Sequence, residues 1–158
     1  MVREIKDAEG FVVRFEEGSW YKCKAEDYVR KASAKSEIEL EKNALAVILA
    51  GGLDDVKPLL EPEQAALVEK YEAAVLAGIE GTAAQIRAIV DGGSELDQKT
   101  FAVEHLRNVP TEMRGLCFYV RKGASAFEAT KALILKNTNS QRDVDASRWL
   151  FGNAAWPL

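Results

Sequence analysis

The sequence is poor in the residue types that build disulfide frameworks and metal centres. Its 158 residues include two cysteines, Cys23 and Cys117, and one histidine, His105. Two thiols this far apart fit neither a disulfide framework nor a metal-ligand spacing, and reduced thiols are typical of cytosolic proteins. We expect His105 to pack against its neighbours or to lie on a helix surface. For Cys23 we expect the role of a small buried side chain.

Long apolar runs are also absent from the sequence. No stretch reaches the roughly eighteen apolar residues of a membrane span. The N-terminal residues VREIKDAEG carry charges where a secretion signal would have an apolar run. We therefore expect a soluble, cytoplasmic protein that has no membrane partner.

Charge is distributed unevenly along the chain. Hydrophobic residues make up 47% and charged residues 29%, which is typical of a globular domain, and the net charge is -4. Residues 1–95 contain 12 Lys and Arg against 19 Asp and Glu, whereas residues 96–158 contain 9 against 6. The overall charge argues against a protein that binds polyanions over its whole surface. The later, basic part is the better candidate for contact with RNA or DNA.

Periodicity predicts a mainly α fold that begins with a short β-hairpin. Apolar residues alternate over 11–15 and again over 20–24, with the turn sequence EEGS between them. After Ala25 we expect one helix ending at Gly51-Gly52, a short helix over 53–60 and a long helix from Pro62 to about 91. Further helices are expected over about 96–107, 111–122, 124–136 and 140–151. In the long helix, Gly78 and Gly81 mark points where a kink or break is expected.

The predicted hairpin has two faces of different chemistry. Lys22 and Lys24 lie two residues apart and so share one face, while Tyr21 and Cys23 point to the other. Two adjacent ammonium groups repel each other unless an anion such as phosphate lies between them. Glu9 precedes the first strand, and a carboxylate suits a Mg²⁺ ion that also contacts phosphate. An ordinary amphipathic hairpin, whose lysines protect an exposed edge, remains an alternative.

The hairpin and two helical segments together resemble a known enzyme family. EGFVV at 9–13 looks like motif IV, and YKCK at 21–24 like motif V, of the covalent nucleotidyltransferases. ILAGGLDDVKPLL at 48–60 and LDQKTFAVE at 96–104 are similar to the C-terminal domain of ATP-dependent RNA ligases of the T-even phage tRNA-repair type, the RNA ligase 1 class. The resemblance extends from Glu9 to about Phe151.

The resemblance implies both a domain organisation and a set of functional residues. Residues 1–24 would be the last strands of a nucleotidyltransferase domain, and residues 25–158 a helical RNA-specificity domain. Glu9 would help to hold the catalytic Mg²⁺, and Lys22 and Lys24 would contact the phosphate of ATP or AMP. RNA, with tRNA as the expected substrate, would meet the basic residues of the later helices: Lys99, Arg107, Arg114, Arg121 and Lys122, with Lys131 and Lys136 nearby in sequence.

The family's reaction also requires a lysine that becomes adenylated, in a Lys-x-Asp/Asn-Gly motif well upstream of motif IV. KDAEG at 6–10 has the wrong spacing, so we do not expect Lys6 to be that nucleophile. We expect the chain alone to be inactive in adenylation and to work with a nucleotidyltransferase region in cis or in trans. A stand-alone RNA-binding module and a structural helical interaction domain remain the alternatives. We expect Trp149, Phe151 and Trp156 to be core or docking residues.

Overall fold

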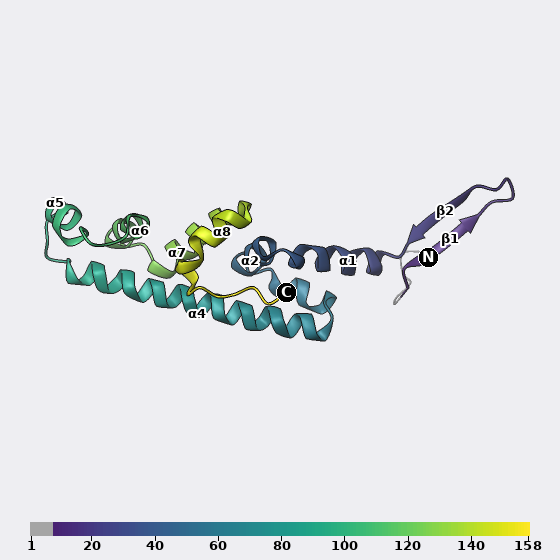
Figure 1. Cartoon of the computed structure of the whole chain (residues 1–158), viewed down its shortest axis with the longest axis horizontal. Helices are drawn as coiled ribbons and strands as arrows, with labels where there is room; N and C mark the ends of the chain where they lie inside the picture. The colour runs from purple at the N-terminus through teal and green to yellow at the C-terminus, as the bar shows by residue number, and fades with distance from the viewer. Residues whose placement is uncertain (1–7) are drawn as a thin grey trace. The chain divides into compact units, whose positions relative to one another are not determined.

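A computed structural model describes residues 8–158 as a mainly helical chain that begins with one β-hairpin (Figure 1). The predicted fold class is therefore confirmed. The chain divides into two compact units, the first comprising residues up to Leu67 together with Leu158, and the second Val68–Pro157. The functional boundary predicted after Lys24 rests on the resemblance and stays a prediction. Lys6 lies outside the described residues.

The hairpin consists of β1 (Gly10–Arg14) and β2 (Trp20–Lys24), which pair antiparallel. The turn between them closes with a hydrogen bond from the Phe15 N–H to the Ser19 carbonyl at 2.9 Å. Gly10 has a φ of 134°, and a Cβ atom there would lie 1.9 Å from the Cys23 carbonyl oxygen. Only glycine fits this position, because the neighbouring strand itself occupies the space.

Three short helical segments follow the hairpin in the first unit. They are α1 (Glu26–Glu39), α2 (Glu41–Leu49) and α3 (Leu53–Val56), the last continued by the 3-10 turn η2 (Lys57–Leu59). The single helix predicted to end at Gly51-Gly52 is thus two helices. Leu40 is extended between them, and its carbonyl accepts from the N–H groups of Asn43 and Ala44. The break lets each helix bury its own apolar residues, so packing overrides local helix preference.

The helices of the second unit follow the predicted order. The long helix α4 (Pro62–Gly92) begins in the first unit and is followed by α5 (Gln98–Thr100), the π-helical turn η3 (Phe101–His105), α6 (Thr111–Arg121), α7 (Ala126–Lys136), the 3-10 turn η4 (Asn137–Asn139), α8 (Gln141–Ser147) and the 3-10 turn η5 (Arg148–Phe151). The predicted helix over 96–107 is replaced by α5 and the π-helical turn.

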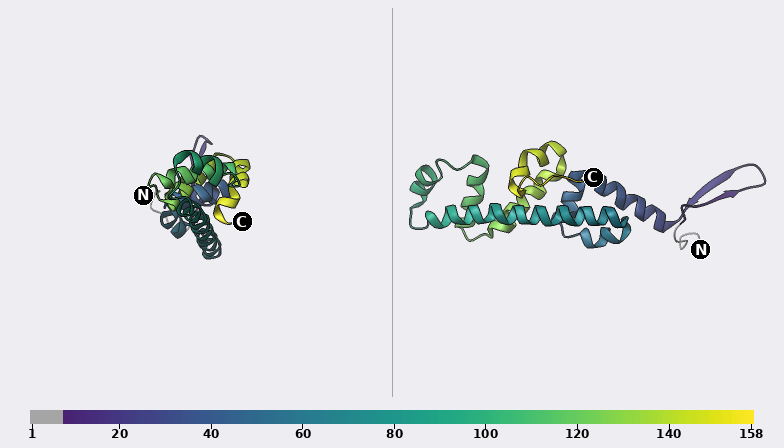
Figure 2. Two further views of the ribbon diagram at one scale, coloured as in Figure 1. Left: turned by 90° about the vertical axis from the view of Figure 1, so that its left-hand side faces the viewer. Right: turned by 60° about the horizontal axis from the view of Figure 1, so that its bottom comes forward.

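Helix α4 is continuous along its length (Figure 2) and supplies an apolar stripe to the core. Its residues at helical spacing are buried: Val68, Tyr71, Val75, Ile79, Thr82, Ala83 and Ile86. The helix does not break at Gly78 or Gly81. Gly78 instead lets the backbone at Phe151 and Gly152 approach the helix directly. Glycine is required at position 78 because the backbone packs closely against it, and not because the helix bends there.

Within residues 8–158, α4 is the one helix long and apolar enough to cross a membrane by length and composition. A buried core helix of a soluble protein passes the same test. The stripe from Val68 to Ile86 is buried inside the protein, and 33% of the apolar window is buried in all. Charged residues such as Glu69, Lys70 and Glu80 lie on its exposed side.

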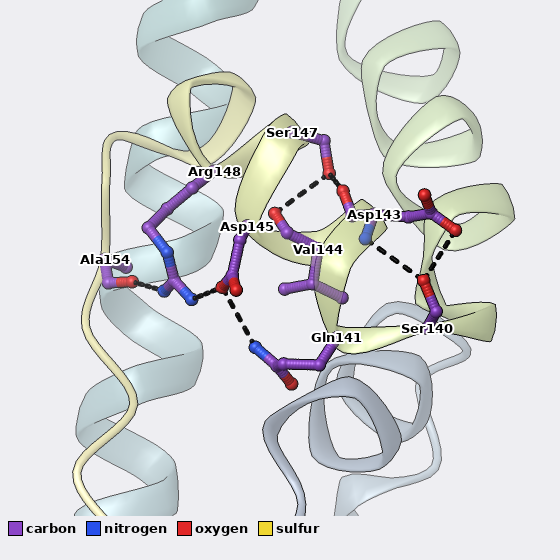
Figure 3. A network of polar contacts seen from close by, with 8 residues as sticks. All are labelled: Ser140, Gln141, Asp143, Val144, Asp145, Ser147, Arg148 and Ala154. Atoms are coloured by element: carbon purple, nitrogen blue, oxygen red, sulfur yellow. Dashed lines mark hydrogen bonds and ion pairs between the residues drawn. The ribbon is translucent and has the colours of Figure 1, made fainter.

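A polar network stabilises the last helical segment (Figure 3). The Ser140 hydroxyl oxygen accepts from the Asp143 N–H at 3.1 Å, which caps the start of α8. The Arg148 guanidinium donates to the Asp145 carboxylate at 2.7 Å and to the Ala154 carbonyl at 2.6 Å. This bonding lowers the pKa of the Asp145 carboxyl, chiefly through the hydrogen bond from Arg148. The network therefore ties the chain after Phe151 to α8, and sequence reasoning did not anticipate it.

Candidate functional site

The hairpin brings a carboxylate and an ammonium group together across 13 residues of sequence. Glu9 precedes β1, and its backbone carbonyl accepts from the Ala25 N–H at 3.0 Å, which extends the ladder by one bond. Its carboxylate Oε1 accepts a hydrogen bond from the Nζ of Lys22. Both side chains are about half exposed, at 48% for Glu9 and 47% for Lys22. The pair therefore lies at the surface, where a ligand can reach both groups.

The contact shifts both pKa values toward the charged forms. The hydrogen bond from Lys22 lowers the pKa of the Glu9 carboxyl, and the same bond raises the pKa of the Lys22 ammonium. Both groups are therefore ionised at neutral pH. An exposed ion pair of this kind contributes little to stability. Because both groups stay charged, the lysine can attract an anion while the neighbouring carboxylate attracts a cation.

Lys24 shares the face of Lys22, as the strand alternation predicts. The register places Lys22 opposite Val12 and Lys24 opposite Gly10. The Lys24 ammonium lies 5.7 Å from the centre of the Tyr28 ring, and its charge also contributes to the lowered pKa of Glu9. The structure thus brings together all three predicted hairpin residues: one carboxylate and two lysines.

A small depression of about 210 Å³ lies next to this group and is lined by Ala8, Glu9, Asp27, Tyr28 and Lys31. It adds a second carboxylate, that of Asp27, which forms an ion pair with Lys31 at 3.0 Å. The described residues contain no group of three or more Asp, Glu, His or Cys side chains able to enclose a metal ion. Mg²⁺ is usually held by only one or two carboxylates together with substrate phosphates and water. The donor set at Glu9 therefore fits a Mg²⁺ ion shared with a phosphate, and does not fit a metal held by protein alone.

The predicted RNA contacts fall into two groups. Arg114 donates from Nε to the Val109 carbonyl at 2.8 Å and from Nη2 to the Arg107 carbonyl at 2.9 Å. Arg121 donates to the carbonyls of Gly93, at 3.0 Å, and Leu96. These two guanidinium groups stabilise the turns around α6, so the fold already uses much of their hydrogen-bonding capacity.

Arg121 also stacks on a core aromatic ring. Its guanidinium carbon lies 4.1 Å from the centre of the buried Phe101 ring. Lys99, Arg107 and Lys122 are exposed on the surface. They are the predicted cations that remain most available to phosphate groups. Sequence spacing alone did not separate these two groups, because the partners of Arg121 lie 25 and 28 residues away.

The remaining candidates have structural surroundings. The His105 ring stacks on Phe101 with centroids 5.3 Å apart, and its Nε2 lies 2.7 Å from the Ile89 carbonyl oxygen. The packing role expected for His105 is confirmed. Phe151 is buried, as expected, and Trp156 packs edge-on against Tyr71 at 4.8 Å.

The two cysteines differ in exposure. Cys23 is partly exposed, so the prediction that it is buried is wrong, since nothing described covers that face of the two-stranded hairpin fully. Cys117 is buried in the second unit, and burial raises the pKa of its thiol.

Comparison with known proteins gives no relative. No protein-family model matches the sequence, and no curated protein or solved structure shows significant similarity to the chain.

Proposed function

We propose that this chain is the C-terminal, RNA-selecting part of an ATP-dependent RNA ligase, acting with a nucleotidyltransferase region that supplies the adenylated lysine. The observation that carries the proposal is the pair of lysines Lys22 and Lys24 on one face of the hairpin, together with the Glu9 carboxylate that contacts Lys22. The resemblance of EGFVV and YKCK to motifs IV and V assigns these same residues to the adenylate site. The reaction would join an RNA 5′-phosphate to a 3′-hydroxyl.

The hairpin residues would bind and orient the phosphate of the nucleotide. The Lys22 ammonium has three N–H donors. One donates to Glu9, which leaves two for phosphate oxygens. Lys24 lies two residues further along the strand, a separation of about 7 Å, and can contact the same anion from the other side. Lysines at this spacing stabilise negative charge that develops during nucleotidyl transfer.

Glu9 would hold Lys22 in position and present its second carboxylate oxygen to a metal ion. ATP with Mg²⁺, when bound, would supply the adenylyl group and neutralise phosphate charge. Within residues 8–158, the carboxylate Oε1 is the Glu9 oxygen that Lys22 contacts, so Oε2 is left to face an ion. Removing the Glu9 carboxylate would therefore weaken both the metal and the placement of Lys22.

The exposed apolar face of the hairpin supports a place in a larger sheet. Phe11 is 40% exposed and Tyr21 63%, and both lie on the face opposite Lys22 and Lys24. A two-stranded hairpin is marginally stable on its own and gains stability when further strands or a helix cover its apolar face. The strands of a nucleotidyltransferase domain would provide that cover.

The RNA half of the proposal is tested on the chain as it exists. We expect it to bind tRNA in a filter-binding assay, with log affinity falling linearly as log salt concentration rises. Reversing the charge of Lys99, Arg107 and Lys122 together should abolish binding at moderate salt. The matched control reverses three other exposed cations, Arg30, Lys35 and Lys70. Absence of tRNA binding at low salt would favour a structural interaction domain.

The ligase half is tested by complementation. The chain is fused to a nucleotidyltransferase region that has a Lys-x-Asp/Asn-Gly lysine but lacks its own motifs IV and V. We expect adenylation and RNA joining to be restored, and to be lost in Glu9→Ala. RNA binding without restored adenylation would favour a stand-alone RNA-binding module. Reading the genomic DNA upstream of Met1 for an in-frame Lys-x-Asp/Asn-Gly motif is an independent test.

A further inference from the structure

Helices α6 and α7 form a groove that the proposed ligase chemistry does not use. The groove has a volume of about 490 Å³ and lies within the second unit. Its walls include Leu116 and Gly115 from α6 and Ala129 and Leu133 from α7. Volumes of 300–1,000 Å³ with mainly apolar walls and a few polar groups are typical of sites for small organic groups. A single nucleobase is a flat group of suitable size.

One aromatic side chain at this groove is unusually accessible. Tyr119 lines the groove and is 65% exposed, whereas the other aromatic residues of α6 and of the turn before it, Phe118 and Phe101, pack against each other at 5.8 Å. An exposed aromatic ring beside an apolar slot provides a surface on which an unstacked base can lie. Tyr119 therefore has the geometry of a stacking residue and makes no ring contact with another aromatic residue among those described.

Two polar side chains lie at the end of the groove that is nearest Tyr119. Ser125 and Glu128, at the start of α7, lie at the end nearest Tyr119, because a short loop joins α6 to α7. The Ser125 oxygen accepts from the Glu128 N–H at 3.3 Å, so its own O–H can still donate. The Glu128 carboxylate offers acceptors only. A ligand here must present donors to Glu128 and an acceptor to Ser125.

The flanking charges indicate where phosphates would lie. Lys122 is exposed three residues after Tyr119, so the two share one face of the chain at the end of α6, and Lys136 lines the opposite end of the groove. The Glu112 and Glu128 carboxylates that line the groove repel phosphate, while Lys136 on its wall and Lys122 after Tyr119 attract it. This distribution suits a base that enters the groove while its backbone remains outside.

From these observations we infer that the α6–α7 groove binds one unstacked guanine base of a single-stranded RNA segment, with Tyr119 as its stacking surface. Guanine is the base whose pairing edge presents two adjacent N–H donors, for the Glu128 carboxylate, beside a carbonyl acceptor, for the Ser125 hydroxyl. The inference rests on the proposed RNA-binding function and adds a base preference to it.

The test uses the full chain and fluorescent RNA heptamers without a 5′-phosphate. One heptamer is all uridine, the second has a central guanosine, and the third has inosine, which lacks the exocyclic amino group. We expect the guanosine heptamer to bind about 5- to 100-fold more tightly than the uridine heptamer by fluorescence anisotropy, with inosine in between, because the two N–H donors of guanine meet the Glu128 carboxylate. Tyr119→Ala should remove this preference and Tyr119→Phe should keep it.

Two control variants make the result specific to the groove. Tyr21→Ala removes a tyrosine of nearly equal exposure, 63%, that lies on the hairpin, and should leave the preference unchanged. Glu128→Gln should reduce the discrimination between guanosine and inosine. Because Tyr119 is exposed, its variants are expected to fold, which circular dichroism verifies. Equal affinity of the unaltered chain for guanosine and uridine heptamers would overturn the inference. A guanosine preference that survives in Tyr119→Ala would overturn it too.

The outcome separates this inference from the proposed function. Salt-dependent tRNA binding without any guanosine preference would refute the groove and leave the RNA-binding proposal intact. Guanosine monophosphate that shifts the Tyr119 ring resonances in NMR, in a chain that binds no tRNA, would support the groove and refute the RNA-specificity role. Displacement of an apolar dye from the groove by a basic amphipathic peptide, but not by guanosine monophosphate, would overturn the inference in favour of a peptide site.

Discussion

The glycine at position 78 offers a sharp test of how the second unit packs. A Cβ atom added there would lie 2.1 Å from the Phe151 carbonyl carbon, 2.2 Å from its oxygen and 2.6 Å from the Gly152 nitrogen. These are backbone atoms, so no change of rotamer can relieve the contact. Overpacking of this kind typically costs about 1–3 kcal/mol, and more where the backbone must move. Gly78→Ala should therefore lower the free energy of unfolding, although alanine favours helix by roughly 0.5–1 kcal/mol.

Gly81 in the same helix provides the matched control. A Cβ atom at Gly81 would meet nothing within 4 Å. Gly81→Ala should therefore raise the free energy of unfolding by roughly 0.5–1 kcal/mol, since only the helix preference changes. Urea and thermal denaturation followed by circular dichroism should separate the two variants by about 2 kcal/mol or more, which is roughly 4 °C or more in Tm for a chain of this size. Equal stability of the two variants would refute the close contact between α4 and the Phe151 turn.

Three further predictions concern the lysines and thiols. In the complemented ligase, Lys22→Ala or Lys24→Ala should each lower the adenylation rate by roughly 10²–10³ without changing Tm measurably, and normal rates in both would exclude the phosphate site. The chain alone should acquire no covalent label from radioactive ATP with Mg²⁺ or Mn²⁺; a labelled band that disappears in Lys6→Ala would contradict this. Under native conditions a thiol reagent should modify Cys23 quickly and Cys117 only on unfolding, because Cys117 is buried and burial raises the pKa of its thiol. Any stability that this pKa shift contributes is present below the ordinary cysteine pKa and is lost as pH rises through the raised value. Equal reaction rates of the two thiols would refute the prediction.

Local patterns in the sequence were sufficient to predict the hairpin and the long helix. Two short runs rich in aromatic and β-branched residues, joined by a glycine-containing turn, have few structural alternatives, and the apolar stripe of α4 repeats over many turns. The break at Leu40 could not be predicted in this way, since neither glycine nor proline marks it. It is set by the apolar contacts that the flanking helices make after they pack.

The candidate site shows the same limit at the level of side chains. Strand alternation predicted that Lys22 and Lys24 share a face, which is a local property. The roles of Arg114 and Arg121 depend on carbonyl groups that the fold brings near them, and spacing along α6 treats these arginines as equivalent to any surface cation. The three-dimensional structure is needed to show that both arginines already donate hydrogen bonds to backbone carbonyls.

Ala25 joins the two parts of the first unit through a single residue. Its N–H continues the strand ladder to the Glu9 carbonyl, and its own carbonyl accepts from the Val29 N–H at 3.1 Å in the first turn of α1. It is fully buried, and no loop separates strand from helix. No flexible linker lies between β2 and α1, and Ala25 is hydrogen-bonded to both Glu9 and Val29. A rotation of α1 would therefore also move the backbone at Glu9, and with it the Glu9 carboxylate.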